Sequence, residues 1–288
     1  MTNISAVLIV KNEEALLGRC LNSIVDADEI VVCDTGSTDN TINIVKGFAM
    51  GHNVALAHFD WCDDFAAARN YAKSFATSEW VLSIDADETL EPGGMDKLRA
   101  ATKTATGNGI GVRLVAEGSG HEHWVPRLFK RSIDWVGAVH ELPQTIATEQ
   151  AEITITYGYS PAHEQDPDRV LRILSNLEDP GPRDLYYLAR EHYYRSDWQK
   201  SVATLDAYLA RAEWMPERAD GWLMMARCLW NLSRGDEART ACLQALANNA
   251  NFKEALEFMA EMSWPENAER WRSFAELADN RNVLFIRT

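Results

Sequence analysis

The sequence has no stretch of about eighteen consecutive apolar residues, the length that a helix needs to cross a bilayer. Its first apolar run, residues 4–10, is short, has no basic residue ahead of it and is followed directly by Lys11. A secretory signal would show a basic start and a longer apolar core. We therefore expect a cytoplasmic protein without stable membrane insertion.

Cysteine and positive charge are also scarce. The chain has 5 cysteines among 288 residues, and none are spaced as the close pairs that zinc sites use. The number is odd and the chain is not short, which disfavours a disulfide framework, and we predict reduced, mostly buried thiols. Lys and Arg number 28 against 43 Asp and Glu, a formal net charge of −15, which disfavours nonspecific binding of nucleic acids.

The first half of the chain alternates the signals of strands and helices. Near-continuous apolar runs at residues 4–10, 29–33, 53–57 and 80–84 are typical of strands covered on both faces. They predict an α/β domain with a mostly parallel sheet, which short runs between residues 110 and 159 extend in antiparallel fashion. Ligands of such sheets bind beyond the carboxyl ends of the strands.

The second half of the chain is helical in pattern. The segments around Ala189 and Ala226 resemble each other, at an offset close to the roughly 34 residues of a tetratricopeptide repeat. An irregular helical bundle is the alternative. We predict a sheet domain, a helical connection and an all-α helical-repeat domain, over residues 1–160, 161–182 and 183–288 respectively.

Two carboxylates, Asp85 and Asp87, follow the strand at 80–84. In extended chain, side chains two residues apart point the same way, and a cation between them relieves their repulsion. Mg²⁺ and Mn²⁺ prefer oxygen ligands and often bridge to phosphates. The pair therefore predicts a metal site for a phosphate-bearing ligand, and a solvated turn is the alternative.

Polar residues also follow the first two strands. Asp34 ends the second strand, where a carboxylate can accept hydrogen bonds from a ribose or a nucleobase. Lys11 and Glu13 follow the first strand in the same layer. The alternatives are local ones: a glycine turn with a helix cap after Asp34, and an N-terminal cap at Glu13.

In this order and spacing, four segments resemble the family 2 glycosyltransferases, which have the GT-A fold, a Rossmann-like mixed sheet. The segments are Val10-Lys11-Asn12-Glu13-Glu14, Asp34-Thr35-Gly36-Ser37-Thr38-Asp39, Ala68-Arg69-Asn70 and Asp85-Ala86-Asp87-Glu88. The resemblance covers about residues 1–160. Residues 61–70, 137–141 and 157–159, with the helical tail, are similar to bacterial and phage transferases with tetratricopeptide-like ends, near the S-glycosyltransferases of bacteriocin peptides.

The resemblance implies an inverting transferase with a nucleotide-sugar donor, usually UDP-linked, and Mn²⁺ or Mg²⁺ as the metal. By position, Asp87 would hold the metal, and Arg69 would lie near the diphosphate or else brace its loop. The donor-binding residues would be Val10, Lys11, Glu13, Asp34, Arg69 and Asp85.

For the catalytic base, which deprotonates the acceptor, we predict Glu141 with His140 beside it. Inverting enzymes usually employ a carboxylate, and this loop is expected to face the donor. The alternatives for Glu141 are a surface carboxylate and a partner that holds an arginine.

One departure from the family concerns the metal. Relatives commonly carry His-Tyr-Gly-Tyr where this chain has Thr156-Tyr157-Gly158-Tyr159. That histidine looks like a metal ligand in the family. Threonine is a poor replacement. His163 is the predicted substitute ligand, with His140 as an alternative, and a third arrangement uses Asp87 and the diphosphate alone.

The acceptor stays open among a peptide or protein, a saccharide and a modified nucleobase. Helical repeats form concave surfaces that suit peptides or self-association, so a homodimer through the helical domain is compatible with the sequence. Two other functions are an interaction protein with a degenerate transferase domain and a nucleotidyltransferase. The latter would normally show a glycine-rich, basic loop, whereas Lys11 is the only basic residue in that turn.

Overall fold

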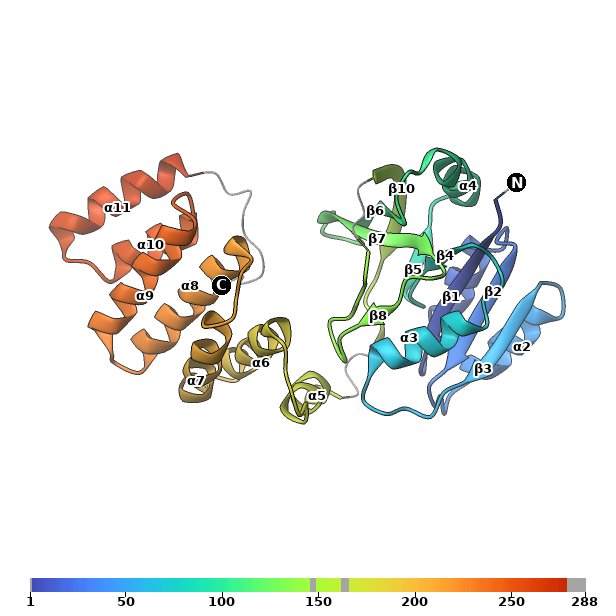
Figure 1. Ribbon diagram of the computed structural model, residues 1–288, viewed down its shortest axis with the longest axis horizontal. Coiled ribbons are helices and arrows are strands. Elements are labelled where there is room, and N and C mark those ends of the chain that lie inside the picture. The colour runs from blue at the N-terminus through green and yellow to red at the C-terminus, as the bar shows by residue number, and fades with distance from the viewer. Residues whose placement is uncertain (1, 146–148, 162–165, 279–288) are drawn as a thin grey trace. The chain divides into compact units, whose positions relative to one another are not determined.

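The computed structural model describes residues 2–145, 149–161 and 166–278 (Figure 1). The chain divides into two compact units, Met1–Pro167 and Asp168–Thr288. Within the described ranges, every helix is too short or too polar to span a bilayer. All 5 cysteines are free thiols, and all but Cys62 are buried, as predicted.

The first unit is built on an eight-stranded mixed sheet with the order β3-β2-β1-β4-β7-β6-β10-β5. Its strands are β1 (Ile4–Val10), β2 (Glu29–Asp34), β3 (Val54–His58), β4 (Trp80–Ser83), β5 (Glu88–Leu90), β6 (Gly109–Ala116), β7 (Glu122–Lys130) and β10 (Glu149–Tyr157). β1 to β4 run parallel to one another, and β7 pairs in antiparallel fashion with both β4 and β6. β10 runs parallel to β6, so the predicted antiparallel extension is wrong for this pair. A second sheet pairs β8 (Trp135–Val136) with β9 (Leu142–Pro143).

Both faces of β1, β2 and β4 are buried, which explains their unbroken apolar runs, whereas the edge strand β3 is only partly covered. Leu8 and Val32 belong to one core cluster, whereas Val7 and Val31 point to the other face and join a second cluster. The helices among the described residues of this unit are α1 (Leu17–Ser23), α2 (Thr41–Ala49), α3 (Phe65–Ser74) and α4 (Gly94–Thr104). Residues of α1, α2 and α4 enter the first cluster and residues of α3 enter the second, so helices cover both faces. The predicted α/β arrangement is confirmed.

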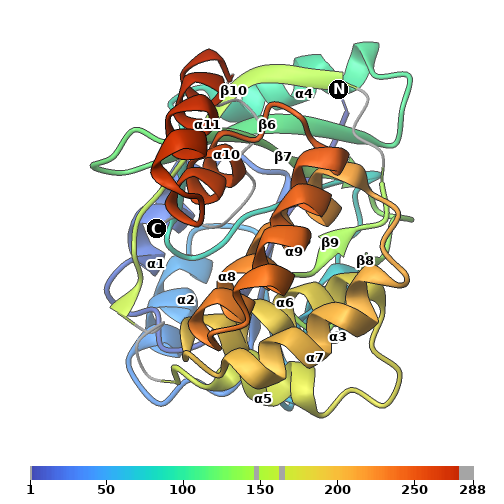
Figure 2. The same ribbon diagram turned by 90° about the vertical axis from the view of Figure 1, so that its left-hand side faces the viewer.

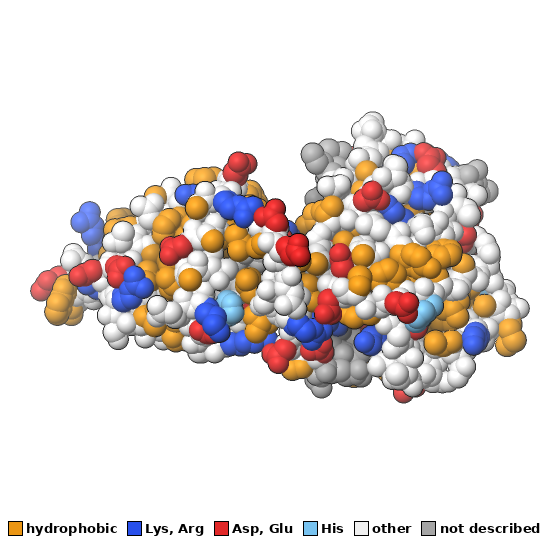
Figure 3. Space-filling model, turned by 60° about the horizontal axis from the view of Figure 1, so that its bottom comes forward, with side chains coloured by type: hydrophobic (Ala, Val, Ile, Leu, Met, Phe, Trp, Pro, Cys, Tyr) orange, Lys and Arg blue, Asp and Glu red, His pale blue; other side chains and the backbone are white. Residues whose placement is uncertain are grey.

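Exposed apolar side chains gather at the β3 edge of this unit, where Figure 3 shows hydrophobic groups side by side. Leu56 on β3 is 39% exposed, Tyr71 on α3 is 40% exposed, and Phe75 directly after α3 is 41% exposed. The Tyr71 ring lies 5.3 Å from that of Phe59 and 5.2 Å from that of Phe75. The three rings form a continuous aromatic row at the edge of the sheet.

The second unit is all helical within the described residues (Figure 2). Its helices are α5 (Arg169–Ser175), α6 (Pro182–Tyr194), α7 (Trp198–Leu209), α8 (Met215–Asn231), α9 (Gly235–Asn248), α10 (Lys253–Glu261) and α11 (Pro265–Leu277). Each helix packs against the next. The turns after α6 and α8 share one geometry, with Ser196 at φ +59° and Ser233 at φ +62°.

Two buried tyrosine–carboxylate pairs tie α8 to its neighbours. Tyr186 of α6 donates to Oδ2 of Asp220, and Tyr208 of α7 donates to Oε1 of Glu217 over 3.1 Å. Oδ1 of Asp220 is buried without a hydrogen-bond partner among the described residues. Burial raises the pKa of Asp220 to about 6, although the hydrogen bond from Tyr186 opposes the rise.

Asp220 therefore makes the helical unit sensitive to pH. The unfolded carboxyl has its ordinary pKa near 4, so the stability that neutral Asp220 contributes is full below that pH and is lost as the pH rises through about 6. We expect Asp220→Asn, which stays neutral, to reduce the loss in free energy of unfolding between about pH 4.5 and pH 7.5 by about 2 kcal/mol.

Urea unfolding at several pH values, followed by circular dichroism, measures this difference. Asp236→Asn is the matched control, since the Asp236 side chain is 97% exposed on the same unit. Parallel pH profiles for the wild type and Asp220→Asn would contradict the expectation.

Candidate active site

The carboxyl ends of β2, β1 and β4 lie side by side at one edge of the sheet. The loops after β1 and β2 are joined by hydrogen bonds: Asn12 Oδ1 accepts from the Thr38 N–H over 2.8 Å, and Ser37 Oγ accepts from the Asn12 N–H over 3.0 Å. Asn12 adopts φ +59°, a left-handed conformation that asparagine tolerates better than most residues. The two loops therefore form one connected surface next to the end of β4.

Asp34 organises its own turn. Its side chain accepts hydrogen bonds from the Gly36 N–H over 3.0 Å and from the Ser37 N–H over 3.1 Å. Nδ1 of His58 lies 3.5 Å from Oδ2, and Asp34 is only 3% exposed. These contacts match the local alternative for Asp34, and its contact with a nucleoside stays a prediction.

The other donor-binding candidates after β1 differ in exposure. Val10 is 3% exposed, and its carbonyl accepts from both the N–H and the hydroxyl of Thr35. Lys11 is exposed and Glu13 is half-buried. Ser160, which lies beyond the end of β10, donates to Glu13 Oε2 over 2.7 Å. Lys11 and Glu13 thus have side chains at the surface, whereas Val10 belongs to the core.

An alternating chain of charged side chains crosses the end of β4. Arg69 of α3 lies 2.9 Å from Oδ1 of Asp85, and Nη2 of Arg127 on β7 donates to Oδ2 of Asp85 over 3.1 Å. Arg127 also donates to Glu88 Oε1. Burial alone would raise the pKa of Asp85, but the two guanidinium groups outweigh it and hold that pKa well below its usual range.

Arg69 links this chain to the predicted base. Its Nε donates to Glu141 Oε1 over 2.6 Å, and its guanidinium carbon lies 4.8 Å from the ring centre of Trp135. The Phe65 N–H donates to the carbonyl of Ala138 over 2.8 Å, which ties the loop before Glu141 to the start of α3. The structure therefore brings Arg69, Asp85 and Glu141 together, with Glu141 holding an arginine.

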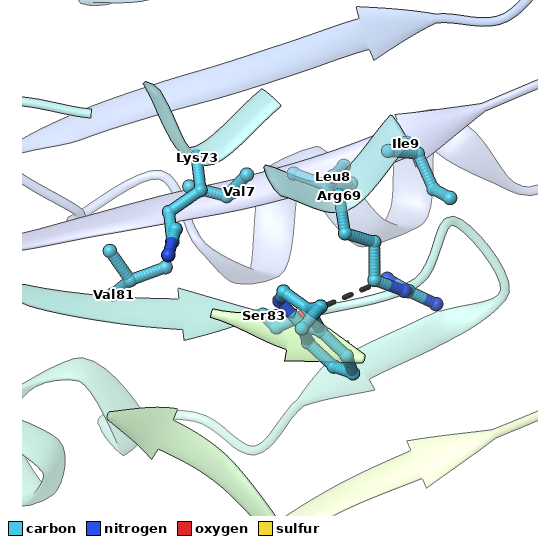
Figure 4. Close-up of a pocket in the computed structure, with 8 residues that line it drawn as sticks. Val7, Leu8, Ile9, Arg69, Lys73, Val81 and Ser83 are labelled. Atoms are coloured by element: carbon cyan, nitrogen blue, oxygen red, sulfur yellow. Dashed lines mark hydrogen bonds between the residues drawn. The ribbon is translucent and has the colours of Figure 1, made fainter. Parts of the chain in front are cut away.

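A small pocket lies between α3 and the strands β1 and β4 (Figure 4). Its lining residues are Val7, Leu8, Ile9, Arg69, Lys73, Val81, Ser83 and Trp135. Arg69 and Lys73 are one helical turn apart and extend from α3 over the strands. Lys73 Nζ donates to Asp134 over 2.7 Å and to the carbonyl of Ile133, so this second buried cation anchors α3 to the segment before β8.

The acidic side chains fit a hard cation only in part. Asp87 is half-buried, and its carbonyl accepts from the Gly158 N–H over 3.1 Å. Burial and the charges of Asp87, Asp85 and Asp39 raise the pKa of Glu13, while its bond from Ser160 opposes the rise. In the described ranges, no three His, Cys, Asp or Glu side chains converge on one metal position. His163 lies outside the described residues.

Sequence reasoning missed two members of the charged chain. Glu88 follows the predicted Asp85–Asp87 pair directly and is only 2% exposed. Burial raises its pKa to about 7, although Arg127 opposes the rise. Arg127 itself lies on β7, in a stretch whose sequence carries no motif. Arg127 could have been linked to Asp85 only by knowing that β7 lies beside β4, and the sequence alone does not give this strand order.

Comparisons with known proteins give one family model and several similar proteins. The sequence model described as Glycosyl transferase family 2 matches residues 5–157. The prophage-derived glycosyltransferase SunS of Bacillus subtilis (strain 168) is 28% identical over 207 residues, covering 65% of this chain and 49% of that one. A TPR repeat-containing protein of Synechococcus elongatus is 47% identical over 91 residues, covering 31% of this chain and 22% of that one. The chain thus spans half or less of these curated relatives.

Among solved structures, a fragment of S. aureus TarS in complex with UDP-GlcNAc is similar to this chain. The sequence identity is 13% and the TM-score is 0.48, with 96% of this chain and 91% of that chain covered.

Removing Arg69 is expected to destabilise the first unit. In the wild type the Arg69 side chain is 11% exposed and pairs with Asp85 and Glu141. Arg69→Met removes this positive charge from beside the two carboxylates. We expect a loss of about 2–4 kcal/mol in the free energy of unfolding, as for a buried ion pair that loses one partner. Urea unfolding of the purified variant measures the loss.

Lys97→Met is the matched control for this loss. Lys97 pairs with Glu91 on the same unit, but its side chain is 53% exposed, and such pairs contribute about 0.5 kcal/mol or less. Equal losses for the two variants would show that the buried network adds nothing to stability.

Proposed function

Because the chain belongs to glycosyl transferase family 2, we propose that residues 1–160 transfer a sugar from a nucleotide-sugar donor, with a UDP-linked sugar as the first candidate. The observation that carries the proposal is the position of Asp85 and Asp87 at the end of β4, beside the loops after β1 and β2. Parallel sheets bind their ligands at this edge. Lys11, Glu13 and Asp34 are the proposed contacts of the nucleoside.

We propose Asp87 as the protein ligand of Mn²⁺ or Mg²⁺. Its carboxylate is an oxygen donor of the kind that these hard cations prefer, and the donor's own phosphates supply further oxygens. When bound, the metal offsets negative charge on the departing diphosphate. The guanidinium of Arg69 lies in the same region, where it pairs with Asp85 and Glu141. His163 stays a predicted further ligand.

Glu141 is the proposed base, with His140 beside it. The base takes a proton from the acceptor as the acceptor attacks the anomeric carbon, in a single displacement that inverts the configuration. Arg69 fixes Glu141 Oε1 at 2.6 Å and thereby holds the carboxylate in one orientation. A positioned carboxylate is what such proton transfer requires.

We further propose that residues 183–288 form a tetratricopeptide-like domain that recognises the acceptor, with a peptide as the first candidate. The equivalent turns at Ser196 and Ser233 support a repeated helix pair. Stacked helix pairs present concave surfaces that suit extended peptides. Saccharide and nucleobase acceptors, a homodimer and a cytoplasmic location stay compatible with this proposal.

A thermal-shift panel tests the donor class. UDP, GDP, CDP and dTDP are each added with Mn²⁺, with Mg²⁺ and with chelator. A ligand at a hundred times its dissociation constant adds about 2.7 kcal/mol, which moves Tm visibly. We expect a shift with UDP that requires the metal. If no nucleotide moves Tm under any condition, a helical peptide-binding protein with a degenerate transferase domain becomes the better account.

Two substitutions separate donor binding from chemistry. Asp87→Asn is expected to abolish the metal-dependent shift by UDP, because the substituted side chain loses its charge. Glu141→Gln keeps an oxygen for Arg69, so the UDP shift is expected to persist while release of UDP from a UDP-sugar falls about a hundredfold or more. In that assay water replaces the acceptor, so the reaction measured is hydrolysis of the UDP-sugar.

Asp96→Asn serves as the control for both substitutions, since the Asp96 side chain is 89% exposed on α4. An unchanged metal-dependent shift in Asp87→Asn would remove Asp87 as the ligand. Turnover near the wild-type rate in Glu141→Gln would remove Glu141 as the base.

A further inference from the structure

Arg127 reaches the end of β4 because β7 is irregular at that point. Ile110 of β6 pairs with Leu128, and Gly111 pairs with Pro126, so Arg127 has no partner on β6. Such a β-bulge re-aims the side chain of the extra residue and is common beside active sites. Pro126 has no N–H to offer to the ladder, which favours a break in pairing here.

The side chain of Arg127 stabilises the turn between Asp85 and Glu88. Asp85 and Glu88 already close this turn on each other: the Asp85 N–H donates to Glu88 Oε2 over 2.9 Å, and the Glu88 N–H donates to the Asp85 carbonyl over 3.0 Å. Nη2 of Arg127 then donates to both carboxylates. The side chains of Arg127 and Glu88 are 13% and 3% exposed, so water competes little for these bonds.

The turn contains Asp87, the proposed metal ligand. Both oxygens of Asp85 are engaged by arginines, Oδ1 by Arg69 and Oδ2 by Arg127. Asp85 therefore acts through its position in the turn rather than as a second, equivalent ligand. The direction in which Asp87 leaves the turn depends on how firmly Asp85 and Glu88 are held.

We propose that Arg127 is a positioning residue for the metal-assisted binding of a nucleoside diphosphate: it locks the Asp85–Glu88 turn so that Asp87 meets the metal and the diphosphate together. This inference rests on the proposed function. Arg127 touches neither metal nor donor, and its effect passes through Asp85 and Glu88. Residues that hold metal ligands in place without touching the metal typically contribute about 10- to 100-fold to metal affinity.

Titration calorimetry of the full chain with UDP, with Mn²⁺ and with chelator tests this role. We expect Arg127→Met to weaken Mn²⁺-dependent UDP binding about tenfold or more. Binding of UDP in chelator, which relies on the loops after β1 and β2, is expected to change less than about twofold. A merely structural loss would weaken both measurements alike, so the split between them is the diagnostic readout.

Arg113→Met is the matched control. Arg113 lies on the neighbouring strand β6, where it contacts Thr154 and Glu122, and its side chain is 37% exposed. Its loss removes one arginine from the same sheet without touching the turn, so both affinities are expected to stay at wild-type values. Arg127→Lys keeps the charge but offers a single donor group, and it is expected to recover only part of the Mn²⁺-dependent affinity.

Should Arg127→Met fail to fold, the double variant Arg127→Met with Glu88→Gln removes the cation and one buried anion together, and it is expected to show the same loss. A folded Arg127 variant that binds UDP with Mn²⁺ as tightly as the wild type overturns the positioning role alone. A wild type that binds UDP under no metal condition overturns the proposed function, and the positioning role falls with it.

Discussion

The ion pair between Arg69 and Asp85 is the contact on which the candidate site depends. It joins α3 to the end of β4 in a place where both side chains are largely shielded from water. A carboxylate in such surroundings stays charged only if cations compensate it. Arg69 also pairs with Glu141, so the loop that carries the proposed base is positioned by the same side chain that fixes the strand end.

The packing of α3 places this ion pair. Ala66 and Ala72 face the core cluster, and such small side chains let the helix approach the sheet closely. Arg69 and Lys73 share the sheet-facing side of the helix and bury their cations there, with Trp135 packed beside Arg69. Long basic side chains can bury their stems while their charged ends find partners. The helix α3 therefore places the cation of Arg69 beside Asp85 at the end of β4.

Local patterns were enough to predict the sheet and the first carboxylates of the site. Apolar runs marked the parallel strands, and the shared edge of such strands brought the Asp34 and Asp85 loops together. Such local patterns do not predict contacts between strands that are far apart in the sequence. Arg127 meets Asp85 only because β7 lies beside β4 and carries a bulge, and no residue spacing encodes either fact. For Glu141 the sequence left three roles open, and its partner Arg69 lies on a distant helix.

The charged side chains alternate in sign from one end of the network to the other: Glu141, Arg69, Asp85, Arg127 and Glu88. Three acids and two bases share this buried space, so each inner member compensates two neighbours at once. A neutral exchange at Arg69 leaves Glu141 without its counter-charge in this network, and one at Arg127 does the same to Glu88. We therefore expect a relative that has lost one of these arginines to have lost the carboxylate at that end of the network as well.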